Sequence, residues 1–331
     1  YPVFNQPPQF TEWMGGYKEQ IIYGKTNNIK ANTEIENEWA SVLIENPSLT
    51  KEKAIQPLLL HTWNQDSPWN AYCPVDANGP GGHVYVGCVA VSMAQLMKYY
   101  NYPNQGTGSH TNYSYWNGGY GNLTINYAAQ TYDWYSMPNI VNGTNYDETA
   151  KLLYHCSVAV DMNYGPDGSG STTSKIATAL KTYYFYSTNI QYVQKSSYTD
   201  ANWKAMLKQQ IDNKWPMSYQ GSDGTSGHAW NCDGYNGDQF HMNWGWSGSA
   251  NGFYDLSSLV AGGYDLTLNQ GAVINVYPAS NYPTFCTGTR NITGKAGAFN
   301  DGSGNQNYLN NIDCTYLIQP ECGNIINLTF D

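Results

Sequence analysis

The sequence is poor in charge and has no long apolar run. Only 12% of its 331 residues are charged, and 15 basic residues stand against 25 acidic ones, for a formal net charge of −10 at pH 7. No basic tract is present, so we expect no binding to nucleic acid or to an anionic membrane surface. No apolar stretch approaches the roughly 20 residues of a membrane-spanning helix, so we expect no membrane span.

Cysteine is also scarce. The seven cysteines are too few for a disulfide scaffold, and their odd number leaves at least one thiol unpaired within the chain. Aromatic residues, in contrast, make up 15% of the chain, which excludes charged disorder and supplies a large core. Abundant Tyr, Asn, Gly and Thr with little Lys are typical of secreted bacterial proteins. We therefore predict an extracellular or cell-surface location in a bacterium.

Composition divides the chain into three parts. Residues 1–56 hold 5 Lys and 7 Glu and include two predicted helices, over 11–22 and 32–44. A compact domain is predicted over 57–280, and residues 281–331 are rich in Asn, Gly and Thr. Within the compact domain we predict helices over 88–100, 146–162, 174–184 and 203–214, then strands over 216–220, 228–235, 239–246 and 252–256. Helices followed by an antiparallel sheet indicate the α+β class.

One stretch, Val86–Tyr100, places a cysteine at the start of a predicted helix. Val89, Met93 and Leu96 recur at helical spacing after Gly87-Cys88 and predict a buried face. The exposed N–H groups and the dipole at a helix N-terminus favour a thiolate over a thiol. Cys88 is therefore a candidate nucleophile, although a lone cysteine is more often simply a small buried apolar residue.

Residues far from this helix supply candidate partners. His228 follows a glycine-rich turn, opens a predicted strand and lies 140 residues after Cys88, a separation within that of papain-like enzymes. Asn243 on the next strand fits the amide that fixes a catalytic histidine, and Trp244 fits its shield from water. Gln65 carries an amide N–H₂ suited to an oxyanion hole with the Cys88 N–H. Each residue alone has a structural interpretation, and the combination indicates nucleophilic catalysis.

Several sequence words resemble the streptopain-like peptidases, secreted bacterial enzymes with the papain-like cysteine protease fold. The similarity runs from about residue 57 to residue 278. The words that carry it are Trp63-Asn64-Gln65, Gly87-Cys88-Val89-Ala90, Ala94–Pro103, Val160–Pro166, Gly227-His228-Ala229 and Asn243-Trp244-Gly245-Trp246 with Asn251-Gly252-Phe253.

The resemblance implies a role for each candidate. Cys88 becomes the nucleophile, His228 the general base and Gln65 an oxyanion donor, and Trp244 ranks above Asn243 as the residue that holds the imidazole. The turn from Gly165 to Ser171 looks like part of the substrate cleft, and the candidate substrate-binding residues are Gly165, Ser169, Ser171 and Gly227.

The resemblance also implies partners. Protein or peptide substrates would carry a hydrophobic residue at the second position before the cleaved bond. Residues 1–56 would be the final part of a removable pro-segment that acts as an intramolecular inhibitor and covers the cleft. No metal and no organic cofactor are implied.

The C-terminal part resembles the opening half of a CUB-type β-sandwich. The similarity implies that Cys286 and Cys314 pair, and it leaves Cys322 without its partner. It rests on Cys286, Gly288, Asp301-Gly302-Ser303-Gly304, Asn307-Tyr308, Asn311, Cys314–Ile318 and Pro320.

Three other functions remain open from the residues. The same Cys–His pair would serve transglutaminase-like acyl transfer, and the abundant Tyr, Trp and Asn would suit a non-catalytic module that binds glycans or proteins. His228, Cys232, His241 and Cys88 would be the ligands of a zinc site. No Cys-x₂-Cys pair or helical His pair supports zinc, so we predict no metal.

Overall fold

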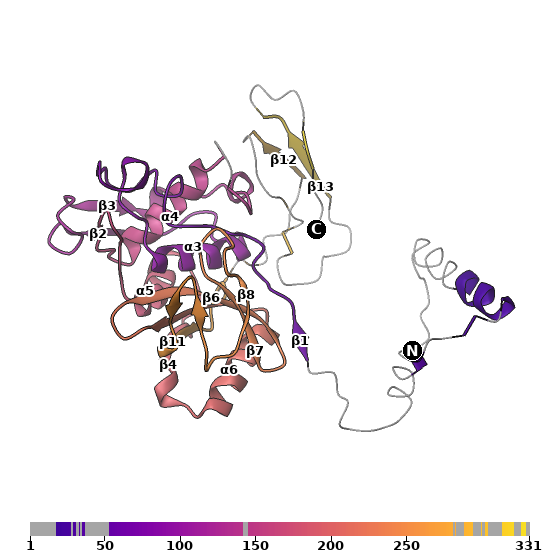
Figure 1. The fold of residues 1–331 in the computed structure, drawn as a ribbon. Helices are drawn as coiled ribbons and strands as arrows, with labels where there is room; N and C mark the ends of the chain where they lie inside the picture. The colour runs from indigo at the N-terminus through magenta and orange to yellow at the C-terminus, as the bar shows by residue number, and fades with distance from the viewer. Residues whose placement is uncertain are drawn as a thin grey trace. The chain divides into compact units, whose positions relative to one another are not determined.

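The computed structural model describes residues 18–27, 29–30, 33, 35–36, 53–141, 145–280, 282, 288–293, 299, 302–303, 313–320 and 326–328. The chain divides into two compact units after Lys53 (Figure 1). In the first unit, residues 18–26 form a helix that overlaps the one predicted over 11–22. Residues 33, 35 and 36 are helical within the second predicted helix, and the rest of both predictions lies outside the described residues.

The second unit carries the helices and the main sheet. In chain order its elements are β1 (Ala54–Ile55), η2 (Pro80–Gly82), α3 (Cys88–Tyr100), β2 (Ser109–Asn112), β3 (Leu123–Asn126), η3 (Tyr127–Ala129), η4 (Trp134–Ser136), α4 (Asp147–Ala159), α5 (Ser174–Tyr183), β4 (Gln191–Gln194), η5 (Lys195–Ser197), α6 (Asp200–Asp212), β5 (Met217–Ser222), β6 (Gly227–Asn236), β7 (Gln239–Asn243), β8 (Gly252–Tyr254), β9 (Val260–Ala261), β10 (Tyr264–Asp265), β11 (Leu268–Ile274), β12 (Gly288–Ile292) and β13 (Cys314–Ile318).

The main sheet is antiparallel and has seven strands, in the order β4-β11-β5-β6-β7-β8 with β1 paired to β6. The four strands predicted after residue 215 are β5 to β8, so the α+β class is confirmed. The prediction omitted β4 and β11, because Leu268–Ile274 lacks the alternation of apolar and polar residues that marks a half-buried strand. Ala54 and Ile55 pair with Asn236 and Tyr235, so the unit begins three residues before the predicted boundary at Pro57.

Helix α3 lies between the helical part and the sheet (Figure 1). Val89, Met93 and Leu96 are buried as predicted, but the opposite face is buried too. On that face the Ser92 hydroxyl donates to the backbone oxygen of Trp230 on β6, at 3.1 Å. On the other side, the Cys156 sulfur of α4 lies 3.7 Å from that of Met97. A helix enclosed on all sides is held rigidly, which suits a support for a reactive group.

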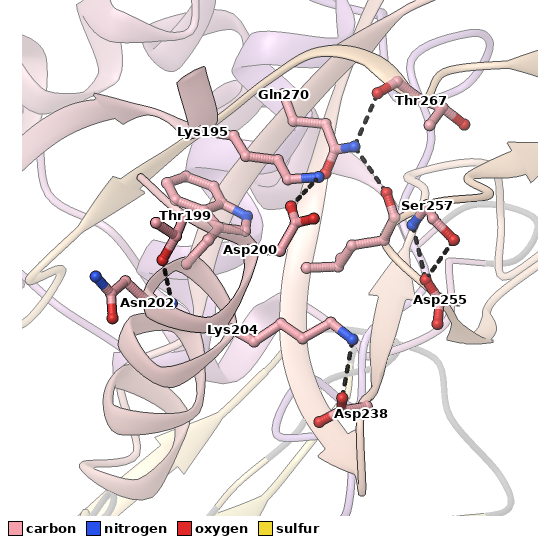
Figure 2. Close-up of polar contacts among 12 residues, drawn as sticks. Lys195, Thr199, Asp200, Asn202, Lys204, Asp238, Asp255, Ser257, Thr267 and Gln270 are labelled. Atoms are coloured by element: carbon pink, nitrogen blue, oxygen red, sulfur yellow. Dashed lines mark hydrogen bonds and ion pairs between the residues drawn. The ribbon is translucent and has the colours of Figure 1, made fainter. Parts of the chain in front are cut away.

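Helix α6 packs its apolar residues into a core shared with β5, β6 and β7, and Figure 2 shows polar contacts around the helix. Its N-cap Thr199 accepts a hydrogen bond from the Asn202 N–H, and Lys204 and Lys208 both reach Asp238, which follows β6, at 2.9 and 2.8 Å. These ion pairs are exposed and contribute little stability. Beneath them the buried Gln270 amide donates to the backbone oxygens of Leu256 and Thr267, both at 2.8 Å.

The C-terminal part holds two described strands. β12 and β13 pair in parallel, from Gly288 opposite Cys314 to Ile292 opposite Ile318. Cys314 is disulfide-bonded, and its predicted partner Cys286 lies outside the described residues, as do most of the residues behind the CUB-like resemblance. Both remain predictions. Among the described helices, none has the length and apolar content needed to span a bilayer.

Candidate active site

Cys88 is the first residue of α3. Gly87 before it has φ 90°, a backbone conformation that residues other than glycine rarely adopt. A Cβ at Gly87 would also lie 2.5 Å from the Met162 sulfur and 3.0 Å from the Ser169 backbone oxygen. The glycine therefore lets the chain turn into the helix while the 162–169 segment packs closely against it. This packing presents Cys88 at the helix N-terminus.

The Cys88 thiol is acidic. Burial raises its pKa, but the charge of His228 and hydrogen bonds from His228 and from the backbone N–H groups of Ala229 and Val89 outweigh burial, so the pKa is lowered overall. Burial alone raises the pKa of the free thiols of Cys73 and Cys156, and Cys232 shifts in the same direction. Among the four free cysteines that the structure describes, Cys88 is the one prepared to act as a thiolate.

His228, on β6, has one ring nitrogen committed to the backbone. Its Nε2 lies 2.8 Å from the Trp244 carbonyl oxygen, which can only accept a hydrogen bond. In a neutral ring the proton therefore sits on Nε2. Nδ1 is then the basic nitrogen that is available for the hydrogen bond with Cys88. Trp244 thus contacts His228 through its main-chain oxygen as well as through its ring.

Three tryptophans pack around the His228 ring. The Trp246 ring is stacked on it with centroids 4.7 Å apart and planes 24° apart, and the rings of Trp230 and Trp244 follow at 5.9 and 6.4 Å. These rings fix the plane of the imidazole and restrict its access to water. The sequence prediction gave no role to Trp246. The available signal was an aromatic residue two positions after Trp244 on the same predicted strand.

Gln65 belongs to a segment that crosses in front of α3. Its backbone oxygen accepts a hydrogen bond from the Val86 N–H at 2.9 Å, two residues before Cys88. The backbone oxygen of Trp63 accepts from the Ser247 N–H at 3.3 Å, and the buried Trp63 indole donates to Pro138. Gln65 is half-buried. Its own bond to Val86 and the bond of Trp63 to Ser247 fix its backbone close to Cys88 in the chain's path.

Asn243 lies behind the pair formed by Cys88 and His228. Its amide Nδ2 donates to the His61 backbone oxygen at 2.9 Å, and its Oδ1 accepts from the Gln95 amide at 3.3 Å. Gln95 in turn accepts from Asn231 at 3.0 Å, and Asn231 accepts from Ser92 at 2.7 Å. This buried amide network (Ser92, Asn231, Gln95, Asn243) joins α3, β6, β7 and the segment before Gln65. Asn243 thus bonds to the supports of the site, whereas Trp244 bonds to the His228 ring.

Breaking the network should destabilise the fold. Asn231→Leu would leave the Gln95 oxygen and one Ser92 contact buried without a partner, so we expect a loss of about 2–3 kcal/mol in the free energy of unfolding. Urea denaturation followed by tryptophan fluorescence measures it. The control is Asn202→Ala on the exposed face of α6, with an expected change below about 0.5 kcal/mol. Equal midpoints for the two variants would show that the network contributes nothing.

His61, which anchors the same segment, predicts acid sensitivity. Burial, with a smaller effect of the Lys98 charge, lowers its pKa from 6.5 to about 3 against the opposing hydrogen bond to Gln95. His61 therefore takes up a proton near pH 6.5 in the unfolded chain but only near pH 3 in the folded chain. The stability contributed by neutral His61 is complete above pH 6.5 and is lost as the pH falls toward 3.

Replacing this ring should flatten the pH dependence. Between pH 6 and 4 the free energy of unfolding should fall with decreasing pH in both proteins, but less steeply in His61→Phe. The two slopes should differ by about 1.4 kcal/mol per pH unit, because the variant takes up one proton fewer on unfolding. Urea titrations at several pH values test this, with Asn202→Ala as a variant whose slope should match the wild type. Parallel slopes for His61→Phe and the wild type would refute the assignment.

The predicted substrate-binding residues fall in two places. Gly165 accepts a hydrogen bond from the Tyr85 N–H at 3.3 Å and donates to the Ser169 hydroxyl at 3.1 Å, and the Ser171 hydroxyl donates to Val160. Ser169 touches Gly87, so this loop borders Cys88. Gly227 begins β6 directly before His228. In the described part of the chain no group of three or more His, Cys, Asp and Glu side chains could hold a metal ion.

Comparisons with known proteins give a consistent result. The model of the Peptidase C10 family matches residues 63–254. Streptopain from Streptococcus pyogenes is 31% identical over 302 residues, which cover 83% of this chain and 72% of streptopain. The thiol protease/hemagglutinin PrtT from Porphyromonas gingivalis is also 31% identical over 302 residues, which are 85% of this chain and 34% of PrtT. The chain thus spans about a third of the length of that relative.

Solved structures agree in fold. Active wild-type interpain A, a cysteine protease from Prevotella intermedia, superposes with a TM-score of 0.63 at 34% identity, covering 70% of this chain and 98% of interpain A. A prointerpain A fragment with a Cys-to-Ala substitution gives a TM-score of 0.60 at 30% identity, covering 83% of this chain and 85% of the fragment. The papain-like fold and the streptopain-like resemblance are therefore confirmed.

Proposed function

Because this chain belongs to the Peptidase C10 family, we propose that it is a secreted cysteine endopeptidase with Cys88 as its nucleophile. The observation that carries the proposal is the acidic Cys88 thiol, placed at the N-terminus of α3 and hydrogen-bonded to His228. A thiolate paired with an imidazolium is the reactive state of such enzymes. The scarcity of lysine in the composition supports secretion.

The mechanism follows from these groups. The Cys88 sulfur attacks the scissile carbonyl carbon, the C–S bond forms, and the carbonyl π electrons move to oxygen. The Cys88 N–H, which has no acceptor within its helix, and the Gln65 amide donate to this oxyanion. As the C–N bond breaks, His228 gives its Nδ1 proton to the leaving amine. His228 then takes a proton from water, whose oxygen attacks the thioester and releases the acid and the Cys88 thiolate.

Trp244 and Asn243 have different tasks in this scheme. The Trp244 carbonyl fixes the tautomer and orientation of His228, and the stacked Trp246 ring holds the plane of the imidazole. Asn243 supports the segment that carries Gln65 through His61. Its effect on catalysis is therefore indirect.

Substrates of this enzyme are polypeptides with a hydrophobic residue at the second position before the cleaved bond. The loop from Gly165 to Ser171 supplies backbone groups beside Cys88, and Gly227 flanks His228 on the opposite element. Peptides that vary only at that second position test the preference. Equal kcat/KM for an apolar and an acidic residue there would contradict it.

Residues 1–56 form the final part of an inhibitory pro-segment, 57–280 form the peptidase domain and 281–331 form a CUB-like extension. The similarity to a prointerpain fragment supports the first of these assignments. Timed mass spectrometry of the purified chain should show a cut between Asn46 and Pro57 that Cys88→Ala does not make. An identical cut in both proteins would assign it to another protease.

Acyl transfer to an amine is the competing chemistry for the same pair. Hydrolysis predicts two products whose masses together equal the substrate plus one water, and these products should stay unchanged when a primary amine such as methylamine is added. Mass spectrometry of a glutamine-containing peptide separates the two reactions. Crosslinking or amine incorporation without cleavage would favour the transferase.

A further inference from the structure

Three large aromatic side chains stand in solvent on the loop that follows β2. Tyr113, Tyr115 and Trp116 are 47%, 75% and 63% exposed. Their rings contact one another: Tyr113 and Tyr115 are stacked with centroids 5.6 Å apart, and Tyr115 and Trp116 are 5.4 Å apart. Clustered exposed aromatic surface of this kind marks a binding site far more often than isolated exposed residues do.

The loop from 113 to 121, called the aromatic loop below, is held in one shape by its own hydrogen bonds. The Trp116 N–H donates to the Tyr113 oxygen at 2.8 Å, and the Gly119 N–H donates to the Ser114 oxygen at 3.0 Å. The fully buried Asn117 donates to Gly121 at 2.6 Å and accepts from the Tyr120 N–H at 3.0 Å. The rings are therefore preorganised, which lowers the entropy lost on binding.

The aromatic loop is hydrogen-bonded to residues 162–164, which lead into the predicted substrate-binding loop from Gly165 to Ser171. The fully buried Asn112 amide donates to the Met162 oxygen at 2.8 Å, and the Asn117 oxygen accepts from the Tyr164 N–H at 3.2 Å. The approach is close, since a Cβ at Gly118 would lie 2.4 Å from the Tyr164 oxygen. The Met162 side chain also approaches Gly87, and the Gly165 oxygen accepts from the Tyr85 N–H, so the aromatic loop and the segment before Cys88 contact the same stretch of chain.

We propose that Tyr113, Tyr115 and Trp116 form an extended substrate subsite that binds a bulky apolar side chain, aromatic or proline, of the polypeptide being cleaved. The proposal rests on the peptidase function above. The aromatic loop contains no charged residue, which favours an apolar occupant over an ionic one. In the proposed mechanism His228 protonates the leaving amine, so residues after the cleaved bond lie on the His228 side. We therefore assign the aromatic loop to a substrate residue several positions before the cleaved bond.

The test compares two fluorogenic peptides. The short one contains only the residues next to the cleaved bond, and the long one adds six residues on the N-terminal side that include Trp and Pro. The enzyme is assayed after removal of its N-terminal segment, and the concentration of active Cys88 is determined on a separate aliquot by titration with iodoacetamide. For the Tyr115→Ser/Trp116→Ser variant we expect kcat/KM on the long peptide to fall about 10-fold through KM, as the loss of one buried apolar contact implies. Activity on the short peptide should stay unchanged.

Two controls separate binding from folding. Tyr115→Phe/Trp116→Phe keeps the aromatic faces and should restore the preference for the long peptide, while Tyr198→Ser, a partly exposed aromatic position beside α6, should leave both activities unchanged. A variant that loses activity equally on both peptides overturns the proposal, because that shows a structural role. Unchanged activity on the long peptide also overturns it and assigns the rings to another occupant, such as a glycan. If the wild type cleaves neither peptide, the peptidase function itself falls, and this subsite falls with it.

Discussion

Replacing Cys88 with alanine is expected to abolish proteolysis. The variant keeps the helix and the cleft but has no atom able to form the thioester, and the donors of the oxyanion hole alone cannot replace it. We expect kcat/KM on casein or a peptide to fall at least about 10⁴-fold, in line with the removal of a nucleophile from other catalytic groups that act as a unit. Self-cleavage between Asn46 and Pro57 should disappear in the same protein.

Cys156→Ala is the matched control. Cys156 is a buried free thiol on α4 whose pKa is raised by burial, so its loss removes a sulfur atom without touching the site. Its activity per folded molecule should remain within about threefold of the wild type, since substitutions outside the site act mainly through stability. Persistent proteolysis by purified Cys88→Ala would refute the assignment of the nucleophile.

Replacing His228 with glutamine is expected to remove the general acid and base and also to weaken the nucleophile. We expect kcat/KM to fall about 10³–10⁴-fold, the upper part of the range for a positioned proton-transfer group. The charge and hydrogen bond of His228 are the main causes that hold the pKa of Cys88 below its usual value. In the variant the pKa of Cys88 should therefore rise, because burial is then opposed only by the backbone hydrogen bonds of Ala229 and Val89.

Alkylation by iodoacetamide as a function of pH measures this second effect directly. In the wild type the rate should stay high in acid solution, because the thiolate persists there, and in His228→Gln it should decline as the pH falls below the ordinary thiol range. His83→Gln is the control, because its ring nitrogen bonds to the Cys73 backbone oxygen. Superimposable alkylation profiles for the wild type and His228→Gln would show that the two residues are not coupled.

Local patterns were enough to predict the catalytic helix and most of the sheet. A glycine followed by a cysteine and a 3.6-residue apolar period predicted Cys88–Tyr100 to its bounds. Strand β11 was missed because apolar and polar residues do not alternate along it. Strand β1 was missed because it has only two residues, and they form a strand only by pairing with β6. Such pairings are non-local, and no pattern within the segment reports them.

The sequence by itself determined the residue types of the site, because a thiol, an imidazole and an amide donor carry the chemistry wherever the fold brings them together. Only the tertiary structure decided how they are supported. It placed the Trp244 main chain and the Trp246 ring against His228 and the Asn243 network behind them, and it bonded the loop that carries Tyr115 and Trp116 to residues 162–164. The physical reason is that hydrogen bonds and ring contacts depend on direction and distance between segments far apart in the chain, such as Asn243 and His61 at 182 residues, which the order of residues does not specify.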